Sequence, residues 1–265
     1  MPRRSLLAFC LLSSACTSLG PIPGATGASV MPRPSPGFEL QTGIVPGYYL
    51  SQATSSDDSE GAALVQTSAF LEPGKLIGLE GLALGARAVG GDDDRGHLEP
   101  MLRYRHGLTD YFAVGVVGFG THAQGSHENA SYSMTRGGLE AGVDLRAIPK
   151  NHFLEIHLLG GGSLTGLSAT GRYCQSNDGY GTDCGENPAN AKAHVAGAYP
   201  SAFAGIALDV ANHLGPLHGL RAQGLVAAGT MPSVRFGEQG SAKSWTSLGL
   251  TLSLALGAWE TSRGE

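Results

Sequence analysis

The chain has 265 residues, of which 41 are glycine, and hydrophobic residues make up 42% of it. Charged residues account for only 15%, whereas a typical soluble domain has about 25%. The hydrophobic content excludes a disordered chain, and the net charge of -5 argues against nucleic acid as the main partner. Outside the N-terminus the sequence has no apolar run of about 18 residues, which excludes a helical membrane protein.

Residues 1–15 have the layout of a secretory signal peptide. Arg3 and Arg4 precede an apolar stretch over residues 6–12, and small residues follow before Cys16. The arrangement is similar to a bacterial lipoprotein signal, and this resemblance implies lipidation of Cys16. Cleavage before a Cys16 that keeps its free thiol is the alternative.

Residues 16–36 contain five prolines separated mainly by small residues. A segment of this composition cannot form a core, so we expect an extended tether that leads into a domain over residues 37–265.

Cys174 and Cys184 lie in a stretch rich in Gly, Asp and Asn. In an exported protein such a pair predicts a disulfide bond. A metal-binding pair is the alternative, but it lacks a nearby histidine or further cysteine.

From residue 37 onward, apolar residues recur with a period of two, which is the period of a β-strand. The clearest case is residues 248–256, where leucine alternates with Gly, Thr, Ser and Ala. In the segment 75–90, Glu80 and Arg87 fall on opposite faces, and a β-bulge would reconcile them. The sequence predicts ten strands, at residues 38–51, 61–71, 75–90, 97–106, 110–124, 131–147, 152–171, 195–211, 216–231 and 242–259.

Short connections, such as the one around Gly107, alternate with longer polar ones. In this respect the chain resembles Gram-negative outer-membrane β-barrel proteins over residues 37–259. The resemblance implies an all-β, antiparallel, up-and-down, porin-like barrel of about ten strands, with short periplasmic turns and long outer loops.

One face of the predicted strands carries leucines and the aromatic residues Phe38, Tyr48, Tyr104 and Phe112, which suit a membrane surface. The other face carries small residues and charges of both signs, which predict a polar network filling the lumen. A conducting or catalytic lumen is the alternative. The predicted lumen network consists of Glu39, Glu99, Arg103, Arg105, Glu140, Asp144, Arg146, Glu155, His157, Asp209 and Arg221.

The sequence has no nucleophile elbow, phosphate loop, zinc-protease helix or dinucleotide fingerprint. It therefore predicts no enzyme, no cofactor and no metal, with the acidic stretches Asp57-Asp58 and Asp92 to Asp94 acting as solvated loops. Calcium binding by these carboxylates is the alternative. An outer-membrane hydrolase with Asp and His at the loop rim is the alternative. Its candidate residues are Asp92, Asp93, Asp94, His97, His122 and His127.

We therefore expect a protein exported to the outer membrane of a Gram-negative bacterium, with a structural or surface-interaction role. Its expected partners are outer-membrane lipid and a surface partner that contacts loops 52–60, 91–96 and 172–194. Two further alternatives are a lipid-anchored periplasmic β-barrel that binds a small apolar ligand, and a narrow channel through the polar lumen.

Overall fold

The computed structural model describes residues 22–23, 27–30, 34–48, 61–73, 77–90, 96–127, 130–147, 154–173, 191–210, 219–236 and 243–259. The elements in chain order are β1 (Ile22–Pro23), the 3-10 turn η1 (Ala28–Val30), β2 (Pro34–Tyr48), β3 (Gly61–Leu71), β4 (Leu82–Gly90), β5 (His97–Gly107), β6 (Phe112–His127), β7 (Ala130–Arg146), β8 (Leu154–Tyr173), β9 (Ala191–Val210), β10 (Gly219–Phe236) and β11 (Lys243–Trp259). The all-β class expected from the sequence is confirmed.

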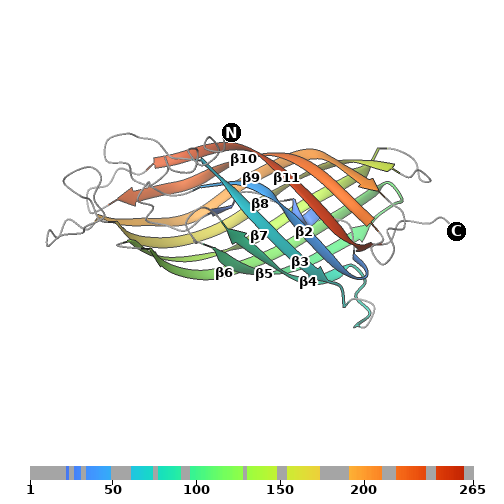
Figure 1. Ribbon diagram of the computed structural model, residues 1–265. Helices are drawn as coiled ribbons and strands as arrows, with labels where there is room; N and C mark the ends of the chain where they lie inside the picture. The colour runs from blue at the N-terminus through green and yellow to red at the C-terminus, as the bar shows by residue number, and fades with distance from the viewer. Residues whose placement is uncertain are drawn as a thin grey trace, which may run out of the picture.

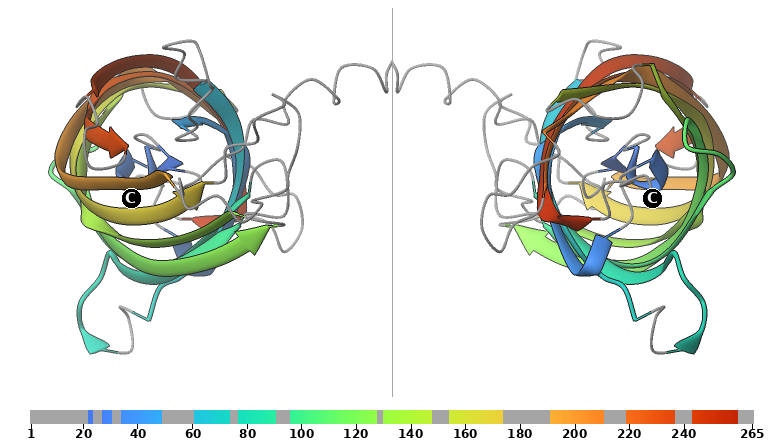
Figure 2. Two further views of the ribbon diagram at one scale, coloured as in Figure 1. Left: turned by 90° about the vertical axis from the view of Figure 1, so that its left-hand side faces the viewer. Right: turned by 90° about the vertical axis from the view of Figure 1, so that its right-hand side faces the viewer.

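The nine strands β3 to β11 form one antiparallel meander, in which each strand pairs with the next along the chain (Figure 1). Taken by themselves, these strands make an open sheet with β3 and β11 at its edges. The sheet is strongly curled, as the end-on views in Figure 2 show. Strand β2 pairs with β3 from Phe38 to Tyr48 and with β11 through pairs such as Ile44 with Leu252. The short strand β1 pairs with the far end of β2.

The two-residue period placed the strands well, and every predicted segment overlaps one strand of the sheet. The predicted segment 75–90 was wrong at its start, because β4 begins at Leu82. Gly78 and Gly81 in the preceding turn have φ angles of 72° and 87°. A positive φ is incompatible with an extended strand, so β4 cannot begin before Leu82. No bulge is needed between Glu80 and Arg87, since Glu80 lies in this turn and Arg87 lies inside β4.

The predicted contrast between short turns and long loops is only partly present. Strands β6 and β7 are separated by residues 128–129 alone, although a longer loop was expected there. At the other end of the sheet, residues 72–81 between β3 and β4 form a longer connection than the predicted turn. Strand β6 is longer than the predicted segment, because residues 125–127 continue the pairing with β7.

Several predictions concern residues outside the described ranges. They are the signal peptide, the lipid on Cys16, the disulfide between Cys174 and Cys184, the loop 52–60, and most of the loops 91–96 and 172–194. The ends of the predicted loop 172–194 belong to strands, because β8 reaches Tyr173 and β9 begins at Ala191. In the part of the chain that the structure describes, no helix is long and apolar enough to span a membrane.

Candidate functional site

Strand β5 shows how the two faces of the sheet differ. Its residues alternate between buried and exposed from His97 to Tyr104. The charged Glu99 and Arg103 are 0% exposed, whereas Leu98 and Leu102 are 63% and 49% exposed. This is the reverse of a soluble β-protein, in which leucines face inward and charges face water.

The exposed face is apolar over most of the sheet. Its large exposed residues in the strands are Phe38, Leu40, Ile44, Val65, Leu71, Leu84, Leu98, Leu102, Tyr104, Val116, Leu139, Val143, Leu145, Leu154, Leu158, Leu164, Ile206, Leu208 and Val226. Two of the predicted membrane-surface aromatics, Phe38 and Tyr104, belong to this face.

The structure places all eleven residues of the predicted polar network on the concave side of the sheet. Nine of them are buried. The other two, Arg105 and Arg146, have side chains that are 12% and 11% exposed. Arg87 and Arg136, which the sequence analysis did not assign to the network, are buried there as well. Arg136 could have been assigned, because it shares the even parity of Glu140 and Asp144 on β7.

One ion pair joins the first long strand to the middle of β5. Arg103 donates two hydrogen bonds to Glu39, at 3.2 Å from Nη1 to Oε1 and 2.9 Å from Nη2 to Oε2. The Arg103 guanidinium also lies over the Phe70 ring, 4.0 Å from its centroid. This paired geometry offsets the desolvation of both charges.

A second cluster surrounds Glu99. Its carboxylate accepts hydrogen bonds from Arg87 and Arg136, which lie on β4 and β7. Arg136 Nε also donates to the Tyr199 hydroxyl at 3.1 Å. Both guanidiniums lie over the Phe119 ring, so two cations share one carboxylate and one aromatic ring.

A third cluster is centred on Asp144. Arg105 Nη2 donates to its Oδ2 at 2.7 Å, and His157 Nδ1 lies 2.6 Å from its Oδ1. Arg221 contacts Asp144 at 3.3 Å and Asp209 at 2.6 Å, so it links the two carboxylates. These strands run antiparallel and end together, which places the cluster near the end of the sheet where β7 leads into β8.

The chain's own N-terminal segment lies on the same concave side. Residues 27–30 are all buried, and Val30 packs with Leu159, Phe203 and Leu225. Glu140 holds the segment by accepting hydrogen bonds from Ser29 N and Ser29 Oγ, both at 2.9 Å. Arg221 Nη1 donates to the Val30 carbonyl oxygen at 2.8 Å.

This placement differs from the extended tether expected for residues 16–36. Nothing in the sequence Gly-Ala-Ser-Val signals burial, because small residues suit a tether equally well. The segment is small enough to fit beside Gly115 and Gly142, where an added Cβ would overlap the Ser29 carbonyl and the Val30 side chain.

We expect Gly115→Ala to lower the free energy of unfolding by about 1–3 kcal/mol, since the new methyl group forces the backbone of Ser29 to move. Gly118→Ala on the same strand is the control, because its Cβ would meet Leu139 at 3.5 Å and the Leu102 carbonyl oxygen at 4.0 Å, which are ordinary contacts. Urea unfolding of both variants in detergent measures the difference. Equal midpoints would show that Ser29 does not lie against Gly115.

Several buried amides on this side have polar atoms with no hydrogen-bond partner among the described residues. They belong to Gln41, Gln66 and Gln223, on β2, β3 and β10. Buried amides of this kind are usually satisfied by internal water.

The hydrolase alternative placed aspartates and histidines together at a rim. The structure puts His97 on the buried side of β5, 3.4 Å from Glu99, and His122 on the exposed side of β6, 2.9 Å from Thr135. It therefore does not bring these two histidines together. Asp92 to Asp94 and the His127 side chain lie outside the described residues.

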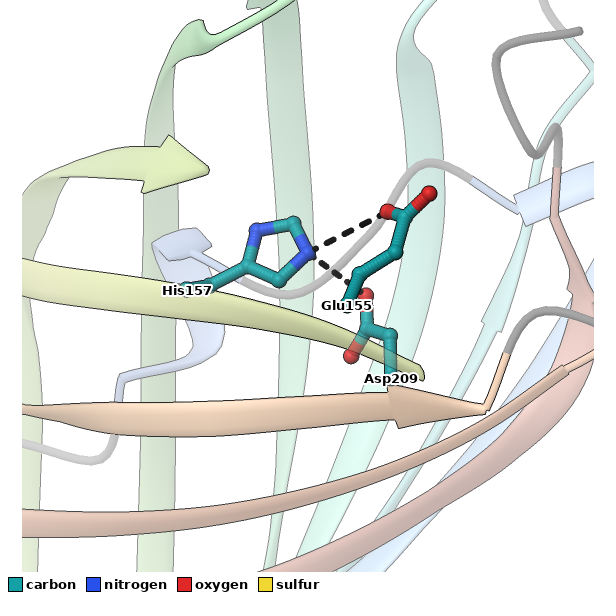
Figure 3. A group of neighbouring side chains, drawn as sticks. All are labelled: Glu155, His157 and Asp209. Carbon is teal, nitrogen blue, oxygen red and sulfur yellow. Dashed lines mark ion pairs between the residues drawn. The ribbon is translucent and has the colours of Figure 1, made fainter. Parts of the chain in front are cut away.

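Two strands bring three potential metal ligands together (Figure 3). Glu155 and His157 are two residues apart on β8 and so share one face, and Asp209 is the direct cross-strand partner of Glu155 on β9. One ligand atom from each lies within 4.8 Å of the other two. Sequence reasoning placed all three residues in the polar network, but the register between β8 and β9 was needed to see them as one group.

Among models of known protein families none matches this chain, and the comparison with curated proteins gives no match either.

Proposed function

We propose that the chain forms a closed ten-stranded β-barrel, β2 to β11, in the outer membrane of a Gram-negative bacterium. Its role is structural or surface-interactive, and its lumen is plugged by its own polar side chains and by residues 27–30. The pairing of β2 with both β3 and β11 supports the closure.

The observation that carries the proposal is the reversed burial of the two faces. In hydrocarbon, exposed leucines are favourable and inward charges need partners. In water, the same exterior would be a large apolar surface with a strong tendency to aggregate. The buried ion pairs also disfavour the alternative of a periplasmic barrel that binds an apolar ligand, because such a ligand needs an apolar interior.

Three observations support a plugged lumen rather than an open channel. The Glu39–Arg103 pair crosses from β2 to β5, and Arg136 on β7 reaches Glu99 on β5. Residues 27–30 are held between Glu140 and Arg221. A surface partner would then contact the loops 52–60, 91–96 and 172–194, and the lipid on Cys16 would add a second membrane anchor.

The test is the electrophoretic mobility of the protein from isolated outer membranes, with and without boiling. A compact, detergent-resistant barrel is expected to migrate differently before boiling, and the protein is expected to need detergent for extraction. Identical mobility, together with release from the membrane by Cys16→Ser, would mean a soluble domain held by a lipid.

A further inference from the structure

We propose that Glu155, His157 and Asp209 bind one divalent transition-metal ion of the zinc class, through Glu155 Oε2, His157 Nε2 and Asp209 Oδ2. The three ligands are brought together by the register of β8 and β9 and by the positions of their side chains. This arrangement is independent of whether the sheet lies in a membrane.

The first step is the orientation of the His157 ring. Its Nδ1 lies 2.6 Å from Asp144 Oδ1, a distance at which the ring donates a hydrogen bond to the carboxylate. In the neutral ring Nε2 then carries a lone pair, and this nitrogen faces the carboxylates of Glu155 and Asp209. The nitrogen and the two carboxylate oxygens are all electron-pair donors. Their approach requires a cation between them, which is a proton or a metal ion.

The second step is that Nε2 lacks a hydrogen bond. The His157 residue is 4% exposed, and its Nε2 is buried with no hydrogen-bond partner in the part of the chain that the structure describes. The nearest carboxylate oxygens, Asp209 Oδ2 at 3.3 Å and Glu155 Oε2 at 3.5 Å, flank the nitrogen without forming one. A proton on Nε2 would therefore satisfy neither oxygen well.

The distances between the three ligand atoms also suit a zinc ion. Two ligands bound to one tetrahedral zinc ion at about 2.0–2.2 Å lie about 3.3–3.6 Å apart. The separations of 3.3 and 3.5 Å from Nε2 fall within this range. One imidazole and two carboxylates are ordinary zinc ligands, and a three-residue set leaves a fourth position for water or a small ligand.

The surroundings match those of a metal site. Asp144 orients the histidine through Nδ1, which is the carboxylate–histidine arrangement common behind bound zinc. Arg221 Nη2 donates to Asp209 Oδ2 at 2.6 Å, and Arg146 Nη2 lies 3.1 Å from Glu155 Oε2. Each oxygen has a second lone pair for the metal. The nearby guanidiniums weaken metal binding, because they already balance much of the carboxylate charge.

The experiment is a calorimetric titration of the folded full chain in detergent with Zn²⁺, followed by Co²⁺, whose visible absorption reports tetrahedral coordination. We expect one equivalent of Zn²⁺ to bind. Binding should be lost in His157→Gln and Asp209→Asn, and should weaken 10–100-fold in Asp144→Asn, since Asp144 positions the histidine.

Two further variants separate a metal site from a merely structural cluster. Arg146→Met is expected to strengthen Zn²⁺ binding, because it removes a positive charge 3.1 Å from Glu155 Oε2. His97→Gln is the matched control and should leave binding unchanged. The His97 ring is also buried and its Nε2 lies 3.4 Å from Glu99, but the Glu99 oxygens are held by Arg87 and Arg136.

The outcomes are distinct. A titration without a stoichiometric zinc equivalent, or zinc binding that persists in His157→Gln, would overturn the proposal and leave His157 as a protonated member of the ion-pair cluster. Repetition with Cys174→Ser and Cys184→Ser removes thiol ligands as a source of binding, so retention of the equivalent in that variant supports the site. Matching circular dichroism spectra establish that each variant is folded, and Glu155→Gln replaces any variant that is not.

Discussion

Leu139→Arg is expected to lower the stability of the protein in a bilayer by about 2–4 kcal/mol, because in the proposed membrane barrel it places a charge at the middle of a strand that faces lipid. Leu139 is 60% exposed near the centre of β7 and pairs with the exposed Leu164 on β8. The same substitution on a water-facing strand would change the stability by no more than about 0.5 kcal/mol. The size of the loss therefore reports what surrounds the sheet.

The measurement is urea unfolding of the protein in lipid vesicles, with the amount of heat-modifiable protein in outer membranes as a second readout. Leu108→Arg is the matched control, since Leu108 is 54% exposed but lies in the turn between β5 and β6. If both variants are as stable as the parent protein, the apolar face is not in contact with lipid.

Glu99→Leu is expected to destabilise the fold by about 3–5 kcal/mol, which is the usual cost of removing one partner from a buried ion pair. Glu99 is 0% exposed and accepts hydrogen bonds from both Arg87 and Arg136. Its loss leaves the positive charge of two guanidiniums uncompensated by this carboxylate. Equilibrium unfolding in detergent gives the change in stability.

The control for this prediction removes the charges together. The triple variant Arg87→Met, Glu99→Leu, Arg136→Met keeps similar side-chain volumes and has no buried charge at this position. Apolar replacement of a whole buried ion cluster is often neutral or stabilising, so most of the lost stability should return. A triple variant no more stable than Glu99→Leu would show that the effect comes from packing against Phe119 rather than from charge.

Much of the sheet could be predicted from the sequence, because a curled sheet with two different environments imposes a strict two-residue period. Strand β3 occupies its predicted range of 61–71. The face of the sheet on which Glu99, Arg103 and Glu140 lie follows from the alternation of residues along each strand. The start of β4 could not be predicted from hydrophobicity. It depends on the positive φ angles of Gly78 and Gly81, which the apolar pattern does not reveal.

The candidate metal site could not be predicted from the sequence. The spacing of Glu155 and His157 places both on one face, but their partner Asp209 lies more than about 50 residues away and is brought beside Glu155 only by the strand register. The burial of Ser29 could not be predicted from the sequence either, since it depends on the position of Glu140 and on the absence of a side chain at Gly115.

The buried segment at residues 27–30 has a consequence for the order of assembly. It directly precedes β2, and β2 pairs with β11 through contacts such as Ile44 with Leu252, about 200 residues apart in the chain. Pairings between such distant segments form slowly. In the proposed closed barrel the segment lies inside, so we expect its burial to be coupled to the late pairing of β2 with β11.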